Sequence, residues 1–211
     1  MSRYQGFRVN GWTCNFTTFS ASELTTIADI PGQIQRLWRS RGQLPGGGRK
    51  SGNFDAREAA EIMVRYDLSR LGVPPSETDE IGSAAAQIML WFALLNSDGT
   101  CEVNGTQEDT ANFLKRFQQD ERIAGALTAE PKVQRYLWKA PGDKLSFATD
   151  IAKVIEAQGQ WAMTFLDLEK SAFDLAEKAG KPLFSIDVSG DAIGRRVRRL
   201  TGQRPSLTVV K

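Results

Sequence analysis

The strongest constraint on the fold is a series of chain breaks between residues 20 and 72. Three stretches there have the apolar spacing of amphipathic helices, at residues 23–28, 31–41 and 56–71. Pro31 stands where a helix begins, because its missing amide hydrogen costs little in the first turn, and Gly42 stands where a helix ends. The breaks limit each helix to a few turns and predict the order helix, turn, helix, loop, helix.

The second of these helices has an apolar face and a polar face. The side chains expected to face inward are Ile30, Ile34, Leu37 and Trp38. The side chains expected to face outward are Gln33, Gln35, Arg36 and Arg39. The helix is therefore expected to present amides and guanidinium groups to its surroundings.

The third and fourth helices are expected to supply much of the core. Asp55 is a typical residue for capping the start of the third helix. Its inward side chains are expected to be Ala59, Ile62, Met63, Tyr66 and Leu71. The fourth helix is expected to reach about residue 96, and its stretch 84–95 is nearly all apolar. So much apolar surface on one helix predicts burial, either against the C-terminal half or across a dimer interface.

Charge is distributed unevenly along the 211 residues. Residues 30–54 hold five basic and no acidic residues, and residues 192–211 hold six basic and no acidic residues. Because the whole chain has a formal net charge of +2, the remainder carries −9. Two basic zones on an acidic body favour a localised anionic partner over general adhesion.

The composition limits the chemistry that the chain can perform. It contains no histidine, so a serine or cysteine nucleophile activated by histidine cannot exist within it. Cys14 and Cys101 are too few for a disulfide framework or a structural zinc site, and they fit a reducing cytoplasm. We expect a cytoplasmic protein that is not an enzyme and that uses no metal or cofactor.

Two further classes of site are disfavoured. The segment GGGRKS at residues 46–51 lacks the glycine that a nucleotide-binding phosphate loop places directly before its lysine. No run of 18 apolar residues occurs, so we expect no membrane-spanning helix.

The basic window 30–54 instead has the features of a surface that meets a phosphate backbone. Glutamine and arginine on an exposed helix can each make two hydrogen bonds to a base edge. Basic residues beside glycines in the loop 43–54 can approach phosphates closely. The candidate DNA-binding residues are Gln33, Gln35, Arg36, Arg39, Arg41, Arg49 and Lys50.

The second half of the chain has a different pattern. The polar, turn-rich segment 97–105 is the predicted boundary between a domain at 1–96 and a domain at 106–211. Helices are predicted at 106–127, 147–157, 167–179 and 191–200, and strands at 133–138, 161–165, 183–188 and 207–210. This alternation predicts a small mixed α/β domain after a mainly helical one, and an α+β fold class for the whole chain.

A cluster of four arginines occurs in the predicted helix 191–200. It consists of Arg195, Arg196, Arg198 and Arg199. The default interpretation is a solvated helix face. A second DNA contact or an acidic partner remains open as an alternative.

Several short motifs of the N-terminal half also follow one another at a familiar spacing. They are Ser22-Glu23-Leu24, Ile30, Arg36, Trp38, Gly42, Leu44-Pro45, Phe54 and Leu71-Gly72-Val73. In this order they distantly resemble the winged helix-turn-helix domain of MerR-type transcriptional regulators, over about residues 19–95. The resemblance implies a sequence-specific DNA-binding regulator of bacterial or phage type. It leaves the C-terminal half to mediate homodimerisation, a protein partner or effector sensing.

Two other functions are open on the sequence alone. The chain can be a DNA-packaging or architectural protein, similar to small terminase subunits or excisionases. It can also be a protein-interaction adaptor that uses a winged fold without nucleic acid.

Overall fold

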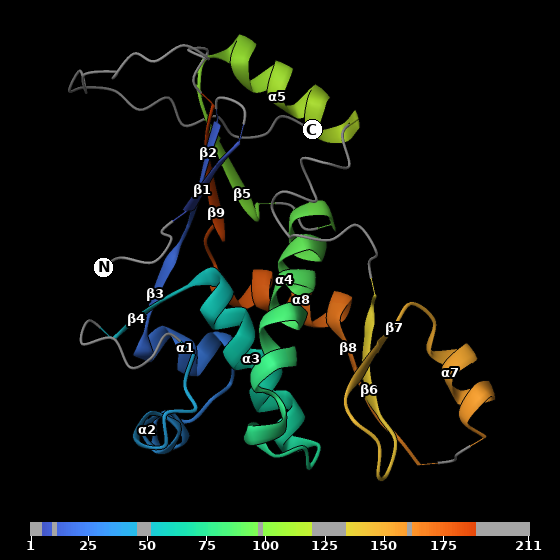
Figure 1. Cartoon of the computed structure of the whole chain (residues 1–211). Coiled ribbons are helices and arrows are strands. Elements are labelled where there is room, and N and C mark those ends of the chain that lie inside the picture. Colours follow the sequence, from blue (N-terminus) through green and yellow to red (C-terminus); the bar gives the residue numbers. More distant parts are fainter. Residues whose placement is uncertain are drawn as a thin grey trace.

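The computed structural model has an α+β fold, as the sequence predicts (Figure 1). It describes residues 6–9, 12–45, 52–96, 99–119, 134–159 and 162–188. No helix within these ranges combines the length and the apolar character that a membrane-spanning helix needs.

The helices and strands alternate irregularly along the chain. The helices are α1 (Ala21–Ile27), α2 (Gly32–Ser40), α3 (Ala56–Arg70), the 3-10 turn η1 (Pro75–Glu77), α4 (Asp79–Asn96), α5 (Gln107–Gln119), α7 (Ile151–Gln158) and α8 (Leu168–Ala179). The strands are β1 (Gly6–Val9), β2 (Trp12–Phe16), β3 (Thr18–Ser20), β4 (Asn53–Asp55), β5 (Cys101–Asn104), β6 (Tyr136–Lys139), β7 (Ser146–Ala148), β8 (Thr164–Asp167) and β9 (Phe184–Val188).

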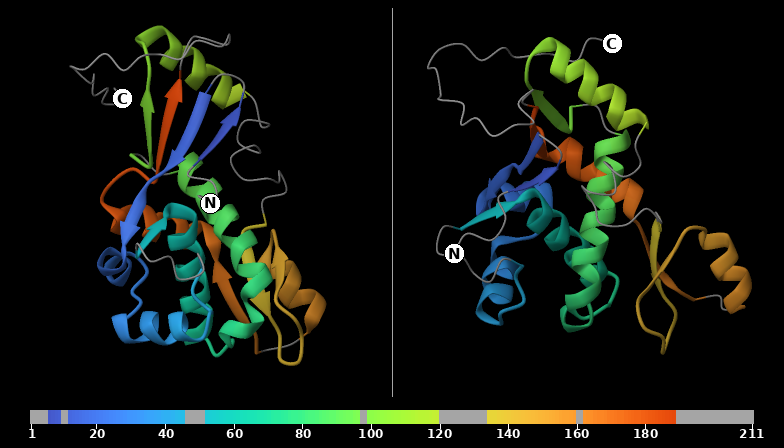
Figure 2. Two further views of the ribbon diagram at one scale, coloured as in Figure 1. Left: turned by 60° about the vertical axis from the view of Figure 1, so that its left-hand side comes forward. Right: turned by 45° about the horizontal axis from the view of Figure 1, so that its top comes forward.

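The largest sheet has four strands in the order β1-β2-β9-β5 (Figure 2). β9 lies between β2, with which it pairs antiparallel, and β5, with which it pairs parallel. Ile186 of β9 is the register partner of both Cys14 and Val103. One sheet thus joins strands from the beginning, the middle and the end of the described chain.

The predicted division at residues 97–105 differs from this arrangement. β9, from the second predicted domain, pairs with β2 of the first and with β5, which lies inside the predicted boundary segment, and α8 packs against α4 and α1. One hydrophobic core contains Phe19 and Leu24 from the N-terminal half with Leu175 and Phe184 from the C-terminal half. β9 therefore joins a sheet whose other strands come from the N-terminal half and from the predicted boundary segment.

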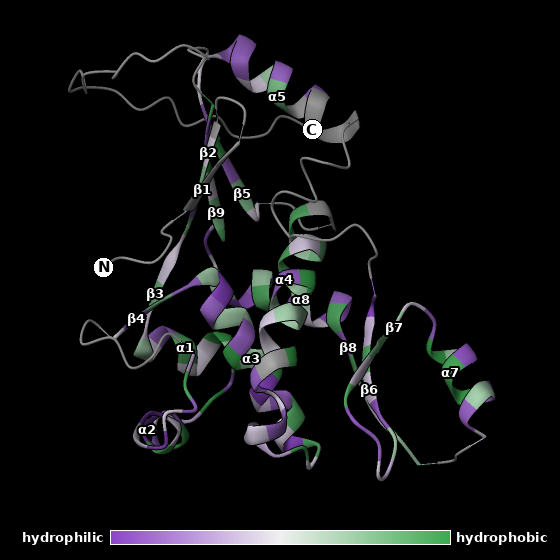
Figure 3. Ribbon diagram, viewed as in Figure 1, coloured by the Kyte–Doolittle hydropathy of each residue, from purple (hydrophilic) through white to green (hydrophobic). Residues whose placement is uncertain are grey.

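The helices α3, α4 and α8 form the centre of the molecule (Figure 1). Ala85, Ala86 and Met89 of α4 are fully buried, and α4 packs along both α3 and α8. Figure 3 shows α4 coloured mainly from white to green, which marks its apolar residues. Part of the stretch 84–95, namely Ala85, Ala86, Met89, Leu90, Phe92 and Ala93, is therefore buried, and its packing on α8 of the C-terminal half was one of the two predicted fates.

The end of α3 corrects one predicted core residue. Ala59, Ile62 and Met63 are buried as expected, but the side chain of Leu71 is 49% exposed. Leu71 caps the helix, and the next residue turns the chain sharply in the left-handed region. Val73 then enters the core in its place, held by a hydrogen bond from its N–H to the carbonyl of residue 68.

Other differences concern the positions of elements. Residues 6–9, 12–16 and 18–20 form three strands, none of which is predicted from the sequence. The predicted helix 147–157 begins only at Ile151, because the side chain of Asp150 accepts the N–H groups that start it, while residues 146–148 form β7. The helix predicted at 191–200 and the strand predicted at 207–210 lie outside the described residues.

Candidate nucleic-acid interface

The first two helices are joined by a short turn at residues 28–31. α1 begins with a capping box, in which the side chains of Ser20 and Glu23 each accept a backbone N–H from the other residue. It ends at the turn, where Asp29 has a φ of 51°, a conformation that aspartate tolerates better than most residues. Pro31 then precedes α2, as the sequence predicts.

Gln35 corrects the predicted outward face of α2. Its side chain is only 3% exposed, and its Nε2 donates to the carbonyl of Ala21, the hydroxyl of Thr25 and the carbonyl of Ile30, each at 3.1 Å. The two amide hydrogens are therefore used within the protein. Gln35 fixes α2 against α1 and is removed from the set of candidate DNA contacts.

The remaining inner side chains hold α2 from the other side. Trp38 is buried, and its ring meets the ring of Tyr66 on α3 edge-on with centroids 6.3 Å apart. Ile30 is fully buried and Ile34 packs partly against the same core. These positions confirm the predicted inward direction of Ile30, Ile34 and Trp38.

The chain leaving α2 is fixed as well. Gly42, with a φ of 67°, ends the helix as predicted, and the carbonyl of Gln43 accepts a hydrogen bond of 3.2 Å from Arg65 of α3. The same guanidinium is paired with Glu61 at 2.5 Å and Asp79 at 2.6 Å, and its side chain is only 7% exposed. α2 is thus anchored along its inner face and at its exit.

The outer face of α2 is formed by a contiguous set of exposed side chains. They are Gln33, Arg36, Leu37, Arg39 and Ser40, followed by Arg41 just after the helix. Residues three and four apart on a helix are neighbours, so these side chains share one surface, hereafter the α2 face. Leu37 was predicted to face inward, but its side chain is 39% exposed because Gln35 takes the inner position. Figure 3 shows hydrophilic and hydrophobic segments alternating on α2.

The arginines of the α2 face differ electrostatically from other cations of the protein. Within the described part of the chain, Arg36, Arg39 and Arg41 form no ion pair. By contrast, Arg65 and Arg135 each contact two carboxylates. Among the described residues, no acidic side chain compensates the positive charge of the α2 face, and an anionic partner would neutralise it.

The predicted loop residues are only partly placed. β4 follows the loop and pairs antiparallel with β3, so the loop returns the chain beside the start of α1. Arg49 and Lys50 lie outside the described residues, as do Arg195, Arg196, Arg198 and Arg199. Their predicted contacts stay predictions.

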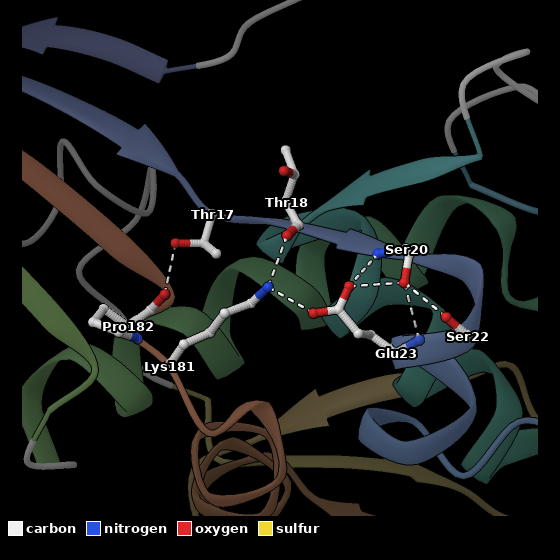
Figure 4. A network of polar contacts seen from close by, with 7 residues as sticks. All are labelled: Thr17, Thr18, Ser20, Ser22, Glu23, Lys181 and Pro182. Atoms are coloured by element: carbon white, nitrogen blue, oxygen red, sulfur yellow. Dashed lines mark hydrogen bonds and ion pairs between the residues drawn. The ribbon is translucent and has the colours of Figure 1, made fainter.

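A segment from the far end of the chain contacts this unit (Figure 4). Nζ of Lys181 donates to Oε1 of Glu23 at 2.7 Å and to the carbonyl of Thr18 at 3.2 Å, and lies 4.6 Å from the ring centroid of Phe19. The hydrogen bond from Lys181 lowers the pKa of Glu23 to about 2, assisted by the bonds from Ser20. The C-terminal half therefore contributes directly to the start of α1.

The turn before α2 is contacted from the same segment. Nζ of Lys178 on α8 lies 2.5 Å from Oδ2 of Asp29. Asp67 of α3 lies near Lys178 and Asp29. Burial raises its pKa, and the positive charges of Arg70 and Lys178 act against this shift. Sequence reasoning missed these contacts because the partners are more than a hundred residues apart.

The cysteines add no reactive group to this region. Both thiols have their pKa raised to about 12, chiefly by burial. Very little thiolate is therefore present at neutral pH. The chemistry available on the α2 face is hydrogen bonding and charge.

No protein-family model matches the chain, and no curated protein is significantly similar to it.

Proposed function

We propose that the α2 face binds the major groove of double-stranded DNA and that the chain is a sequence-specific transcriptional regulator of bacterial or phage type. The observation that carries the proposal is the set of exposed arginines Arg36, Arg39 and Arg41, which have no acidic partner among the described residues and lie on or next to a helix anchored along its inner face. A helix fits the major groove, and rigid support keeps its side chains in register with base edges.

The roles within the surface follow from side-chain chemistry. Arg36 and Arg39 suit guanine, and Gln33 suits adenine, because each can make paired hydrogen bonds to those bases. Arg41 stands beyond the helix end and suits a phosphate, as do Arg49 and Lys50 of the loop. The order β3, α1, α2, loop, β4, α3 supports assigning this unit to a winged helix-turn-helix.

A single α2 face is small for a specific complex. The helix has 9 residues, which limits the base pairs that it can read. Two copies on adjacent half-sites would double the contacts. The proposal therefore includes a homodimer and a palindromic site.

The decisive experiment is selection of bound sequences from random duplexes, followed by affinity measurements on the selected site and a scrambled site. Affinity is measured at several salt concentrations, because the slope reports the phosphates neutralised. A defined motif, bound at least about 10³-fold more tightly than scrambled DNA, is the expected result. Equal binding to both sites would contradict sequence-specific regulation and favour a packaging or architectural role. No duplex retained at low salt would contradict DNA binding and favour an adaptor.

Matched variants assign the contacts. Arg36→Lys keeps the charge but loses the paired geometry, so it should lower affinity for the selected site by about 10-fold or more and leave scrambled DNA nearly unchanged. Lys50→Ala should weaken both alike and reduce the salt slope by about 1. Arg70→Ala is the control, since this exposed arginine lies on α3 outside the α2 face. Similar losses in all three variants would refute the assignment.

A further inference from the structure

Leu37 is the one large apolar side chain on α2 that is exposed. The helix has other apolar residues, but Trp38 is buried and Ile34 packs partly against the core. Leu37 lies one turn after Gln33 and one turn before Arg41, within the α2 face. An isolated exposed leucine needs no explanation. This one lies among side chains proposed to meet base edges.

The chemistry of the major groove gives such a side chain a specific partner. Amide and guanidinium groups read the hydrogen-bonding atoms of adenine and guanine, and they gain little from the 5-methyl group of thymine. An apolar side chain recognises that methyl group by excluding water from it. The other members of the α2 face are Gln33, Arg36, Arg39, Ser40 and Arg41, all polar.

The residues around Leu37 set the direction of its side chain. Ser40 donates its hydroxyl hydrogen to the carbonyl oxygen of Leu37 at 2.9 Å, so the hydroxyl is engaged with the helix. Gln35 and Trp38, on either side in sequence, are both buried. Their packing fixes the rotation of α2 and so directs Leu37 outward.

We infer that Leu37 determines specificity by contacting the 5-methyl group of a thymine in the bound duplex. The inference rests on the proposed binding of DNA by the α2 face. Gln33 and Leu37 are about 6 Å apart along the helix axis, which is less than two base-pair steps of roughly 3.4 Å each. Gln33→Ala should change the base preference at one position of the site. The thymine that Leu37 contacts should lie within two base pairs of that position.

The test replaces each thymine of the selected duplex, one at a time, by deoxyuridine, which lacks only the methyl group. Replacement at one position should weaken binding of the unchanged protein about four-fold, the factor for taking one methyl group out of water. Leu37→Ala should bind the thymine and deoxyuridine duplexes equally. Leu71→Ala, which changes an exposed leucine just after α3 and outside the α2 face, should keep the four-fold difference.

The possible outcomes separate this inference from the proposed function. Tight binding to the selected site with no deoxyuridine effect at any position overturns the role of Leu37 and leaves DNA binding intact. An equal deoxyuridine effect in the unchanged protein and in Leu37→Ala also overturns it, because another side chain then reads the methyl group. Failure to bind any duplex overturns both.

Discussion

Replacing Gln35 separates two roles that a glutamine on α2 can have. The side chain is buried and bonds to the backbone and side chains around α1. A base-reading glutamine would affect DNA binding and leave stability unchanged. A glutamine that fixes the helix should affect stability first. Gln35→Leu is the informative change, because it removes the hydrogen bonds with a modest change in volume.

The size of the effect follows from the three oxygen atoms around Nε2. The carbonyl oxygens of Ala21 and Ile30 and the hydroxyl of Thr25 each lie 3.1 Å away. An amide nitrogen has two hydrogens, so two full bonds are made at one time. Each net bond contributes about 1 kcal/mol. Gln35→Leu should therefore lower the free energy of unfolding by about 2 kcal/mol, or roughly 4–8 °C in Tm for a chain of this length.

Urea denaturation measures this free energy, provided that the slope with denaturant is the same for both proteins. Gln33→Leu is the matched control, since it makes the same change on the exposed side of the same helix and should alter stability by less than about 0.5 kcal/mol. If Gln35→Leu unfolds like Gln33→Leu while only DNA affinity is lost, the assignment of Gln35 to the interior is refuted.

Three further variants test the support around α2 and the sheet. Arg65→Met leaves the buried carboxylate of Glu61, on the same helix, without its partner. Urea denaturation should show that the free energy of unfolding falls by about 3–5 kcal/mol. A fall of less than about 1 kcal/mol would contradict the role of Arg65 in anchoring the chain after α2. Lys181→Met should raise the pKa of Glu23 from about 2 toward its ordinary 4.5. A depressed pKa of Glu23 stabilises the folded state above pH 4.5, and this stabilisation is lost as the pH falls toward 2. Lys181→Met should therefore lose less stability between pH 4.5 and pH 2 than the unchanged protein. An equal loss in both proteins would contradict the pairing of Lys181 with Glu23. Gly105→Ala would place Cβ 2.7 Å from a backbone oxygen of β9, so it should lower Tm and cost about 1–3 kcal/mol of the free energy of unfolding. At Gly32 a Cβ would meet only the end of the Arg36 side chain, at 3.9 Å, so Gly32→Ala should leave Tm nearly unchanged.

Helix positions in the N-terminal half were largely predictable because their signals are local. Pro31, Gly42 and Asp55 act at the helix ends where the sequence places them. The rotation of α2 was not fully predictable. Apolar spacing assigned Leu37 to the interior, yet a buried amide occupies that side. A buried polar residue with its bonds satisfied carries no signal in a hydrophobic pattern.

The sheet was the least predictable part of the fold. β9 is visible in sequence as a strand. Its neighbours β2 (WTCNF) and β5 (CEVN) also alternate apolar and polar residues, but β5 lies within a segment whose turn-forming residues predict a loop. Strand pairing depends on residues distant in sequence, which no local pattern encodes. The expected boundary at 97–105 followed from turn-forming residues, and such residues mark a loop whether or not a domain ends there.

The position of α1, and through it of α2, depends on several contacts with the C-terminal half, which differ in strength. The ion pair between Lys178 and Asp29 is partly exposed to solvent, and such pairs contribute at most about 1 kcal/mol. Stronger support comes from Thr17, whose N–H donates to the carbonyl of Leu183 at 3.0 Å and whose hydroxyl donates to that of Pro182 at 2.6 Å. These bonds extend the pairing of β2 with β9 to the start of β3. A displacement of β9 would therefore reach α1 and the turn before α2, whereas loss of the exposed ion pair alone would leave the α2 face in place.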